Sequence, residues 1–282
     1  MPEGDTIFRA ARRLHAALAG KPVVGFDTAY AQIARAAERR PVVGRRVEDV
    51  SSVGKHCLVR FTDDLVLRTH CRMHGAWHLY RPGERWQRAP HRMRVRIDVP
   101  DFVAVAFDVP VAELRTGAAL ARDPALAKLG PDLLADGFDP AEAVRRARAL
   151  GDEAVGVVLL RQTVAAGIGN VYRSEILHLA GLHPATPTSA LGDEELASLF
   201  AVARRLLRAN VAVGAPGEVV FSGGMRRTTG FLDPGARLWV YGRAGEPCRR
   251  CEAPVAVAKQ GEDARVVFWC PRCQPGPDAA PA

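Results

Sequence analysis

The chain of 282 residues is short of lysine, of long apolar runs and of internal repeats. Only four of its 39 basic residues are lysines, so arginine supplies most of the positive charge. The four are Lys21, Lys55, Lys128 and Lys259. No apolar run approaches the roughly 20 residues of a transmembrane helix, which argues against a membrane-spanning protein. The N-terminus becomes amphipathic and charged within a few residues, so we find no secretory signal. We therefore expect a soluble, cytoplasmic protein.

The charge balance favours a polyanionic partner. The formal net charge is +8 and the isoelectric point is about 9.6, which is typical of proteins that bind nucleic acid. Arginine bias with abundant alanine is also what a skewed coding composition produces. Charge alone therefore does not decide the partner.

The first three residues place an amine beside a carboxylate. Removal of Met1 would leave Pro2 with a free secondary amine, followed directly by Glu3. The ordinary pKa of an α-amine is about 8, against about 10.4 for a lysine side chain. Much of such an amine is neutral at physiological pH, and its attack on a sugar carbon would give a Schiff base. The alternative is an ordinary translation start.

Four cysteines near the C-terminus form two Cys-x2-Cys pairs separated by 18 residues. They are Cys248, Cys251, Cys270 and Cys273. This spacing predicts a four-thiolate zinc site, and segments 255–258 and 265–269 are expected to form a hairpin that turns at Gly261. Disulfides are the alternative, but cytosolic thiols stay reduced. Four protein ligands leave no open position, so we expect one structural Zn²⁺.

The first helix is expected directly after the N-terminal amine. Apolar residues recur at helical spacing over 7–18, and Asp5 and Thr6 are good N-cap residues. Pro2 and Glu3 would then precede a helix N-terminus. Its partial positive charge favours the neutral amine and the ionised carboxylate.

The remaining pattern divides the chain into a strand-rich and a helical half, which suits two domains. Short strands typical of an antiparallel β-sandwich are expected at 47–53, 57–61, 65–68, 77–80, 92–99 and 103–107. Cys57 and Cys71 lie in such apolar stretches and are interpreted as buried core thiols. After a helical fragment and linker at 118–134, helices are expected at 140–150, 152–164, 171–180 and 193–210. The fold class is therefore α+β.

A glycine-rich segment, residues 162–175, joins two of these helices. We expect one helix to end at Gly167 and Asn170 to cap the next. Glycines allow close approach of the backbone, and N–H groups at a helix N-terminus bind phosphate. Such contacts hold a duplex without reading its sequence. The alternative is an ordinary Gly-Asn turn.

These segments together resemble the bacterial formamidopyrimidine-DNA glycosylase/endonuclease VIII family of DNA repair enzymes, and more closely its endonuclease VIII branch. The resemblance covers the whole chain except the C-terminal tail. It rests on segments 2–4, 54–56, 70–75, 128–132, 167–175, 240–243 and 268–274, in this order.

The resemblance implies a multidomain protein that clamps DNA. An N-terminal antiparallel β-sandwich with flanking helices would be the catalytic domain, and a helix-two-turn-helix domain would precede the zinc-finger hairpin. The corresponding ranges are 1–121 for the sandwich, 122–135 for a linker, 136–239 for the helical domain, 240–274 for the hairpin and 275–282 for a disordered tail. The damaged nucleotide would leave the stack, because its anomeric carbon is unreachable inside the duplex.

The family resemblance also implies the catalytic residues. Pro2 would attack C1′, expel the base and form an iminium, and Glu3 would donate and shuttle protons. Lys55 would contact phosphate and assist β-elimination, although a solvated hairpin lysine is the alternative. Arg265 would contact phosphates beside the lesion and is linked to δ-elimination.

Further residues are implied as DNA contacts. Lys128 and Asn170 match positions that bind the DNA backbone. Arg72, Met73 and His74 match the tip that fills the hole left by the flipped nucleotide. Met73 suits such a wedge because it is unbranched and apolar, and a core methionine is the alternative.

Two departures from the family pattern affect what is expected. Asp5-Thr6 replace a second Pro-Glu pair, and Met73-His74 differ from the wedge of the best-known endonuclease VIII type. The segment 221–238 looks shorter than the capping loop of the purine-directed branch, so we expect oxidised pyrimidines as substrates.

The resemblance also fixes the expected partner. It is damaged double-stranded DNA in the bacterial nucleoid, with single-stranded or bubble DNA as an alternative, and we expect no membrane and a monomer. The rival functions are a purine-directed glycosylase, an abasic-site lyase with little glycosylase activity, a damage sensor of the same fold and a transcriptional zinc ribbon.

Overall fold

The computed structural model describes residues 2–211, 225–231 and 233–276. The described chain forms two compact units, residues 2–128 and residues 129–276 with the stated gaps. Their boundary, between Lys128 and Leu129, falls within the predicted linker. No helix among the described residues is long and apolar enough to cross a membrane. Most of the predicted tail, residues 277–282, lies outside the described part.

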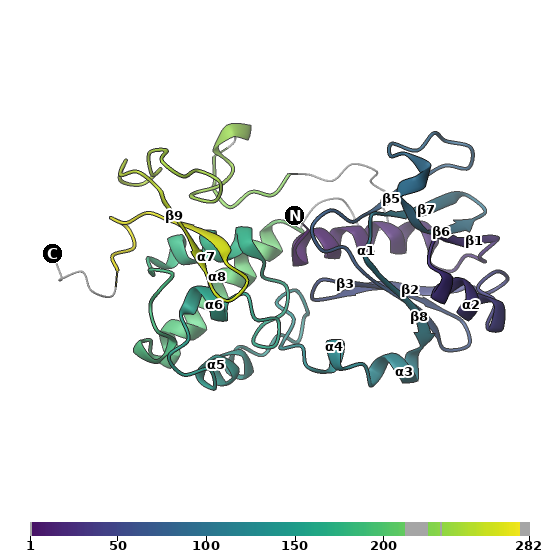
Figure 1. Cartoon of the computed structure of the whole chain (residues 1–282), viewed down its shortest axis with the longest axis horizontal. Coiled ribbons are helices and arrows are strands. Elements are labelled where there is room, and N and C mark those ends of the chain that lie inside the picture. The colour runs from purple at the N-terminus through teal and green to yellow at the C-terminus, as the bar shows by residue number, and fades with distance from the viewer. Residues whose placement is uncertain (1, 212–224, 232, 277–282) are drawn as a thin grey trace. The chain divides into compact units, whose positions relative to one another are not determined.

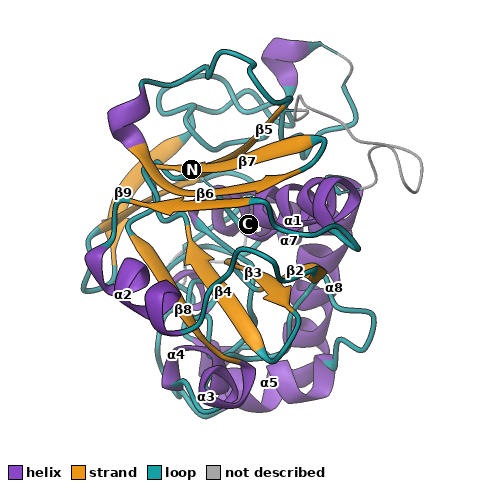
Figure 2. Cartoon of the chain, turned by 90° about the vertical axis from the view of Figure 1, so that its right-hand side faces the viewer, coloured by secondary structure: helices purple, strands orange, loops and turns teal. Residues whose placement is uncertain are grey.

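The first unit contains two antiparallel sheets, and Figure 2 shows them as separate layers. One sheet has the order β2-β3-β4-β8, with β2 at Val47–Val53, β3 at His56–Phe61, β4 at Leu65–His70 and β8 at Val111–Thr116. The other has the order β1-β6-β7-β5, with β1 at Gly25–Thr28, β6 at Met93–Val99, β7 at Phe102–Phe107 and β5 at Ala76–Tyr80. Both sheets contribute to a single apolar core, which includes Val59, Leu67, Val95 and Ala104. The predicted antiparallel sandwich is confirmed.

Helix α1 (Gly4–Leu18) packs on this core, and Figure 1 shows it in purple. Ile7, Leu14 and Leu18 are buried, in keeping with the predicted helical spacing. The predicted N-cap is wrong, because the N-cap residue is Glu3 and both Asp5 and Thr6 lie within the first turn. The Thr6 hydroxyl donates to Asp5 Oδ1 at 3.2 Å, and Arg9 one turn further along pairs with Asp5 Oδ2 at 3.5 Å.

Three elements of the first unit were not predicted. They are β1, β8 and helix α2 (Ala31–Arg39). Strand β1 is only four residues long, and α2 buries just Ile33, so neither carries a strong apolar pattern. Two short helices, α3 (Gly117–Ala121) and α4 (Pro124–Ala127), end the unit, and a 3-10 turn η1 (Pro90–Arg92) precedes β6.

The second unit is helical, with α5 at Pro140–Arg148, α6 at Val155–Val158, α7 at Asn170–Ala180 and α8 at Asp193–Ala209. The 3-10 turns η2 (Thr188–Ala190) and η3 (Pro234–Ala236) complete it. The predicted helix 152–164 is wrong in length, because only α6 is helical there. Gln162 stabilises a turn instead: its side chain bonds the Leu160 carbonyl at 2.8 Å, the Ile168 carbonyl at 2.9 Å and the Gly167 N–H at 3.1 Å.

The predicted C-terminal hairpin is confirmed. Strands β9 (Ala256–Gln260) and β10 (Arg265–Trp269) pair antiparallel, and β10 packs against α7. Gly261 in the turn has a φ of 76°, a left-handed backbone conformation that glycine adopts more easily than other residues.

Candidate active site

Pro2 and Glu3 lie at the N-terminus of α1. Pro2 is half-buried, whereas the Glu3 side chain is fully buried at 0% exposure. The Glu3 carbonyl accepts from the N–H groups of Thr6 at 3.0 Å and Ile7 at 3.1 Å, which begins the helix. The partial positive charge of a helix N-terminus stabilises a carboxylate at this position. A buried acid thus directly follows Pro2 in the chain, at the start of the helix.

Lys55 lies in the two-residue turn between β2 and β3. Val53 and His56 pair across the strands, and Gly54 has a φ of 57°, which suits glycine in a tight hairpin turn. Helix α1 packs on both β2 and β3. The two strands that flank the Lys55 turn are therefore also the strands on which α1, the helix that follows Pro2 and Glu3, packs.

Two histidines lie beside the Lys55 turn. His56 pairs across the sheet with His70 at the end of β4, and their ring centroids are 4.7 Å apart. Burial lowers the pKa of His56 to about 3, with a further contribution from His70. Burial also lowers the pKa of His70 to about 4, with a contribution from the Lys55 ammonium. Both imidazoles are consequently neutral at physiological pH.

Residues 72–74, which we call the tip, connect β4 to β5 and are all exposed. Met73 is 54% exposed, so it is not a core methionine. Arg72 has a φ of 45°, in the left-handed region. Directly after the tip, the Gly75 N–H donates to the Cys71 carbonyl at 2.9 Å, and a Cβ on Gly75 would lie 2.6 Å from that oxygen. This close approach explains why position 75 holds a glycine.

The four C-terminal cysteines form a metal site. Their Sγ atoms all lie within 4.8 Å of one another. All six cysteines, each of which the structure describes, are free of disulfides. Cys57 and Cys71 are buried in the first unit, as predicted, and burial raises the pKa of the Cys71 thiol to about 12. The four clustered Sγ atoms of the C-terminal set could hold one Zn²⁺, whereas Cys57 and Cys71 belong to no such cluster among the described residues.

Gln274 connects the cysteine hairpin to α7. Its Oε1 accepts from the Cys270 N–H at 3.0 Å and lies 3.2 Å from His178 Nδ1, and its Nε2 donates to the Leu182 carbonyl at 2.7 Å. Gln274 is fully buried. Sequence reasoning assigned no role to Gln274 or His178, although Gln274 directly follows the last cysteine.

Asn170 is the first residue of α7, and the N-cap is Gly169, so the predicted capping role is wrong. The Asn170 side chain instead donates to the Val266 carbonyl of β10 at 2.6 Å. Arg173 is fully buried and donates to Asn170 Oδ1 at 2.6 Å and to the carbonyls of Arg265 at 3.2 Å and Val266 at 2.8 Å. One buried guanidinium therefore brings together two predicted DNA contacts, Asn170 and Arg265.

The Arg265 side chain itself is exposed and pairs with Asp263 at 3.4 Å. Its position on β10 depends on the contacts that Arg173 makes with the backbone. The role of Arg173 was missed because its partners on β10 are more than 90 residues away in the sequence.

Glu175 is a second buried anchor on α7. Its carboxylate accepts from the backbone N–H groups of Trp239 at 2.7 Å, Val240 at 2.9 Å and Tyr241 at 2.8 Å, and from the Thr228 hydroxyl. These bonds fix the segment that leads into the cysteine hairpin. Three N–H donors to one carboxylate explain how a fully buried acid is accommodated.

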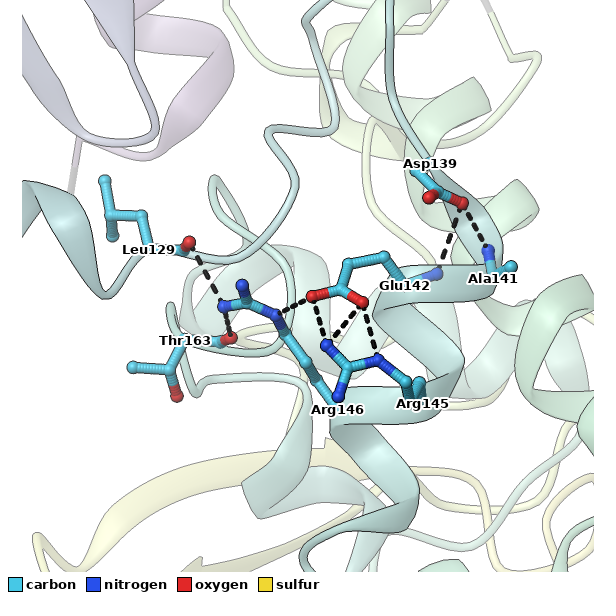
Figure 3. A network of polar contacts seen from close by, with 7 residues as sticks. All are labelled: Leu129, Asp139, Ala141, Glu142, Arg145, Arg146 and Thr163. Carbon is cyan, nitrogen blue, oxygen red and sulfur yellow. Dashed lines mark hydrogen bonds and ion pairs between the residues drawn. The ribbon is translucent and has the colours of Figure 1, made fainter.

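Lys128 is exposed at the C-terminus of α4, where the first unit ends. The next residues are held by the second unit: Arg146 donates to the Leu129 carbonyl at 3.2 Å and to the Thr163 carbonyl at 2.9 Å (Figure 3). A Cβ on Gly130 would lie 2.2 Å from the Val164 carbonyl, so only glycine fits there.

Family models match three parts of the chain. The formamidopyrimidine-DNA glycosylase N-terminal domain matches residues 1–110, the H2TH domain of that glycosylase matches 129–222, and a zinc finger found in FPG and IleRS matches 245–276. A probable endonuclease 8 2 of Streptomyces coelicolor is 42% identical and aligns over 100% of this chain and 96% of its own. The chain belongs to the formamidopyrimidine-DNA glycosylase/endonuclease 8 family.

Other relatives place it in the endonuclease 8 branch of this family, as predicted. The DNA-(apurinic or apyrimidinic site) lyase Nei2 of Mycolicibacterium smegmatis is 37% identical over 97% of this chain and 99% of its own. An endonuclease 8 of Escherichia coli is 32% identical over 97% of this chain and 100% of its own.

A solved structure of the family shows the same fold. The Fpg (MutM) of Lactococcus lactis, in complex with DNA that contains an oxidized pyrimidine, has a TM-score of 0.81 at 24% identity, covering 98% of this chain and 100% of its own.

Proposed function

We propose that this protein removes oxidised pyrimidines from DNA and then cuts the strand, with the Pro2 nitrogen as nucleophile. As a member of its family, it is a DNA glycosylase and abasic-site lyase of base excision repair. The observation that carries the finer proposal is that the residue directly after Pro2 is a buried glutamate at the N-cap of α1.

The chemistry proceeds by two kinds of bond cleavage. The Pro2 amine attacks C1′ of the flipped nucleotide and the bond from C1′ to the base breaks. The sugar ring then opens at the C1′–O4′ bond, with a proton delivered to O4′, and an iminium forms between Pro2 and C1′. Glu3 supplies a proton to the sugar ring or to the leaving base. Loss of the C2′ proton then expels the 3′ phosphate, and a second elimination expels the 5′ phosphate. A one-nucleotide gap with a phosphate at each side remains.

The other predicted residues hold DNA in this scheme. Lys55 contacts phosphate beside the reacting sugar and assists β-elimination, and its turn is rigid enough to place it. Asn170, Arg265 and Lys128 contact the DNA backbone, with Arg265 assisting the second elimination. The tip fills the hole left by the flipped nucleotide, which the exposure of Met73 supports.

The cysteine site holds one zinc ion with a structural role. Four thiolates complete a tetrahedron, so no position remains for a reacting water. Because β10 carries Arg265 and lies between the cysteine pairs, the metal would fix the position of that arginine. Zinc would therefore support DNA binding without taking part in bond cleavage.

The choice of oxidised pyrimidines rests on membership of the endonuclease 8 branch and on the length of segment 221–238. Residues 221–224 and 232 of that segment lie outside the described residues. The Lactococcus lactis relative has been solved with an oxidized pyrimidine, so the fold is compatible with such a substrate.

Borohydride trapping tests the proposal. Reduction of the iminium on a duplex that carries one thymine glycol should link the protein to DNA, and mass spectrometry of the peptides should place the link at Pro2. A protein with residues left ahead of Pro2 should give no adduct. An adduct on Lys55, or full activity in the extended protein, would overturn the role of Pro2.

A second candidate is an abasic-site lyase with little glycosylase activity, which the name of the Mycolicibacterium smegmatis relative favours. Rates on a thymine glycol duplex and on a preformed abasic duplex separate the two. A glycosylase cuts both, whereas a lyase cuts only the abasic duplex.

A further inference from the structure

Arg88 contacts the backbone of the tip. It belongs to the segment 81–92 between β5 and β6, and its Nη1 donates to the His74 carbonyl at 3.1 Å and to Asp108 Oδ2 at 2.7 Å. One guanidinium nitrogen carries two N–H groups, so both bonds are made together. The Arg88 side chain is 27% exposed and Asp108 is 18% exposed, so the pair is mostly shielded.

Asp108 is itself held in place at the end of β7. It has a left-handed φ of 52°, and its carboxylate also accepts from Arg92 Nε at 2.9 Å and pairs with Arg92 Nη2 at 2.6 Å. Its N–H donates to the Arg92 carbonyl at 3.0 Å. Bonds from Arg92 and Arg88 lower the pKa of Asp108, so it is ionised at neutral pH.

Within the described part of the chain, the other hydrogen bonds of the tip lie at its two ends. The Arg72 N–H donates to His70 Nδ1 at 3.2 Å, and Gly75 bonds back to Cys71. The three tip side chains point their polar and apolar groups toward solvent, since all three residues are exposed. Arg88 is thus the contact through which the β5–β6 segment and β7 hold the far end of the tip.

We propose that Arg88, oriented by Asp108, is a positioning residue that holds the tip in the conformation that enters the DNA duplex. The inference rests on the proposed function, in which the tip fills the hole left by the flipped nucleotide. Holding a loop in its bound conformation removes the ordering cost that it would otherwise incur on binding. Arg88 therefore acts through the tip and needs no contact with the reacting sugar.

Two variants separate this role from direct phosphate binding by Arg88. Arg88→Ala removes the bond to the His74 carbonyl together with one positive charge. Asp108→Asn keeps every positive charge and suits the left-handed backbone, but it weakens the anchor of Arg88. Positioning predicts that both variants impair insertion. If Arg88 instead binds phosphate directly, the Asp108→Asn variant should bind DNA as tightly as the wild type or more tightly. Arg85→Ala, in the same segment and exposed, is the control for charge loss.

Insertion is measured with a duplex that carries a tetrahydrofuran abasic analogue and a neighbouring 2-aminopurine. Unstacking of that base by wild-type protein should raise its fluorescence at saturation. We expect the rise to be at least threefold smaller in Arg88→Ala and reduced in Asp108→Asn, with Arg85→Ala like the wild type. The ratio of incision rates on duplex and single-stranded abasic DNA should fall at least fivefold in Arg88→Ala, because a single strand has no hole to fill. Arg88→Lys should recover part of the loss.

An unchanged fluorescence rise and an unchanged rate ratio in both variants would overturn the inference. Weaker binding by Arg88→Ala beside normal insertion by Asp108→Asn would overturn it in favour of a phosphate contact. Borohydride trapping of the same proteins on the thymine glycol duplex, whose C1′ can form the iminium, tests the proposed function separately: a Pro2 adduct in the wild type with no fluorescence rise on the tetrahydrofuran duplex would reject tip insertion but retain the glycosylase chemistry.

Discussion

The two units present their functional residues by different means. In the first unit, local backbone conformation places Pro2 and Glu3 before a helix and Lys55 in a two-residue turn, whereas the tip also depends on the contact from Arg88. In the second unit, Asn170 and Arg265 are placed by buried polar side chains whose partners are distant in the sequence. The first arrangement is local, and the second is cooperative.

This difference has consequences for mutation. A locally placed residue can lose its reactive group while the fold survives, because few other groups depend on it. A residue in a buried polar network leaves several donors and acceptors unsatisfied when it is removed. Variants of the first unit should therefore reduce chemistry without loss of stability, whereas variants of the second should reduce both stability and DNA binding.

Loss of a metal ligand should have the largest effect, and it tests the cooperative unit. Cys251→Ser removes one of four clustered thiols, and a structural zinc contributes about 10 kcal/mol or more to folding of its site. We expect less than half a zinc per chain by atomic absorption and at least a tenfold loss of DNA affinity. Cys57→Ala, a buried cysteine of the first unit, is the control and should retain its zinc. Full zinc content in Cys251→Ser would contradict the assignment.

Glu3→Gln tests the local unit. The amide has nearly the same shape but cannot donate a proton as an acid does, so base excision should fall by about 10²–10⁴-fold. The melting temperature should change little, and zinc content should be unaffected. Single-turnover rates on a thymine glycol duplex measure the effect. Glu48→Gln, an exposed change on β2, provides the matched control. A variant that unfolds would show that Glu3 supports the fold rather than the chemistry.

Arg173→Met should destabilise the second unit by about 3 kcal/mol, because it removes the charged donor for Asn170 Oδ1 and for the Arg265 carbonyl. Urea unfolding measures this change, and DNA affinity should fall with it because β10 is no longer held. Arg145→Ala removes an exposed guanidinium that pairs with Glu142 on α5, and its stability should be nearly that of the wild type. Equal stability of the two variants would show that the buried contacts of Arg173 do not hold the second unit together, and the cooperative description of that unit would fail.

The same contrast explains what the sequence could predict. The predicted strands of the sandwich are short apolar segments, some of them buried along nearly their whole length as in β4 and β7, and the cysteine hairpin follows ligand spacing, so both were predicted closely. The N-terminal pair and the Lys55 turn are contiguous segments, so their local structure could also be anticipated. Strand β8 was missed because it is short and buries only Ala112 and Leu114, while the partners of its charged residues Glu113 and Arg115 come from other elements.

The contacts that sequence reasoning missed join residues that are far apart in the sequence. The conformation of Asn170 depends on Val266, which is 96 residues away, and the predicted N-cap role failed for this reason. Arg88 could not be connected with the tip, because nothing local links an arginine in one loop to a carbonyl in another. Local propensity describes backbone conformation, whereas buried hydrogen bonds depend on tertiary contacts.

The smallest effect concerns pH and the histidine pair beside Lys55. An unfolded histidine has a pKa of about 6.5, whereas folding lowers the pKa of His56 to about 3. Between these two pKa values the folded state thus binds fewer protons than the unfolded state. The contribution of His56 to stability is therefore fully present above about pH 6.5 and is lost as the pH falls. We expect His56 to account for about 1 kcal/mol of the stability lost between pH 7 and pH 5, after allowance for solvent screening.

Urea unfolding of His56→Gln at both pH values measures this contribution, with the exposed His91→Gln as control. The variant should lose less stability on acidification than the wild type does, while the control should behave like the wild type. An equal loss in His56→Gln would mean that the imidazole beside Lys55 is solvated in solution. Burial around the Lys55 turn would then contribute less to the stability of the first unit than the lowered pKa of His56 implies.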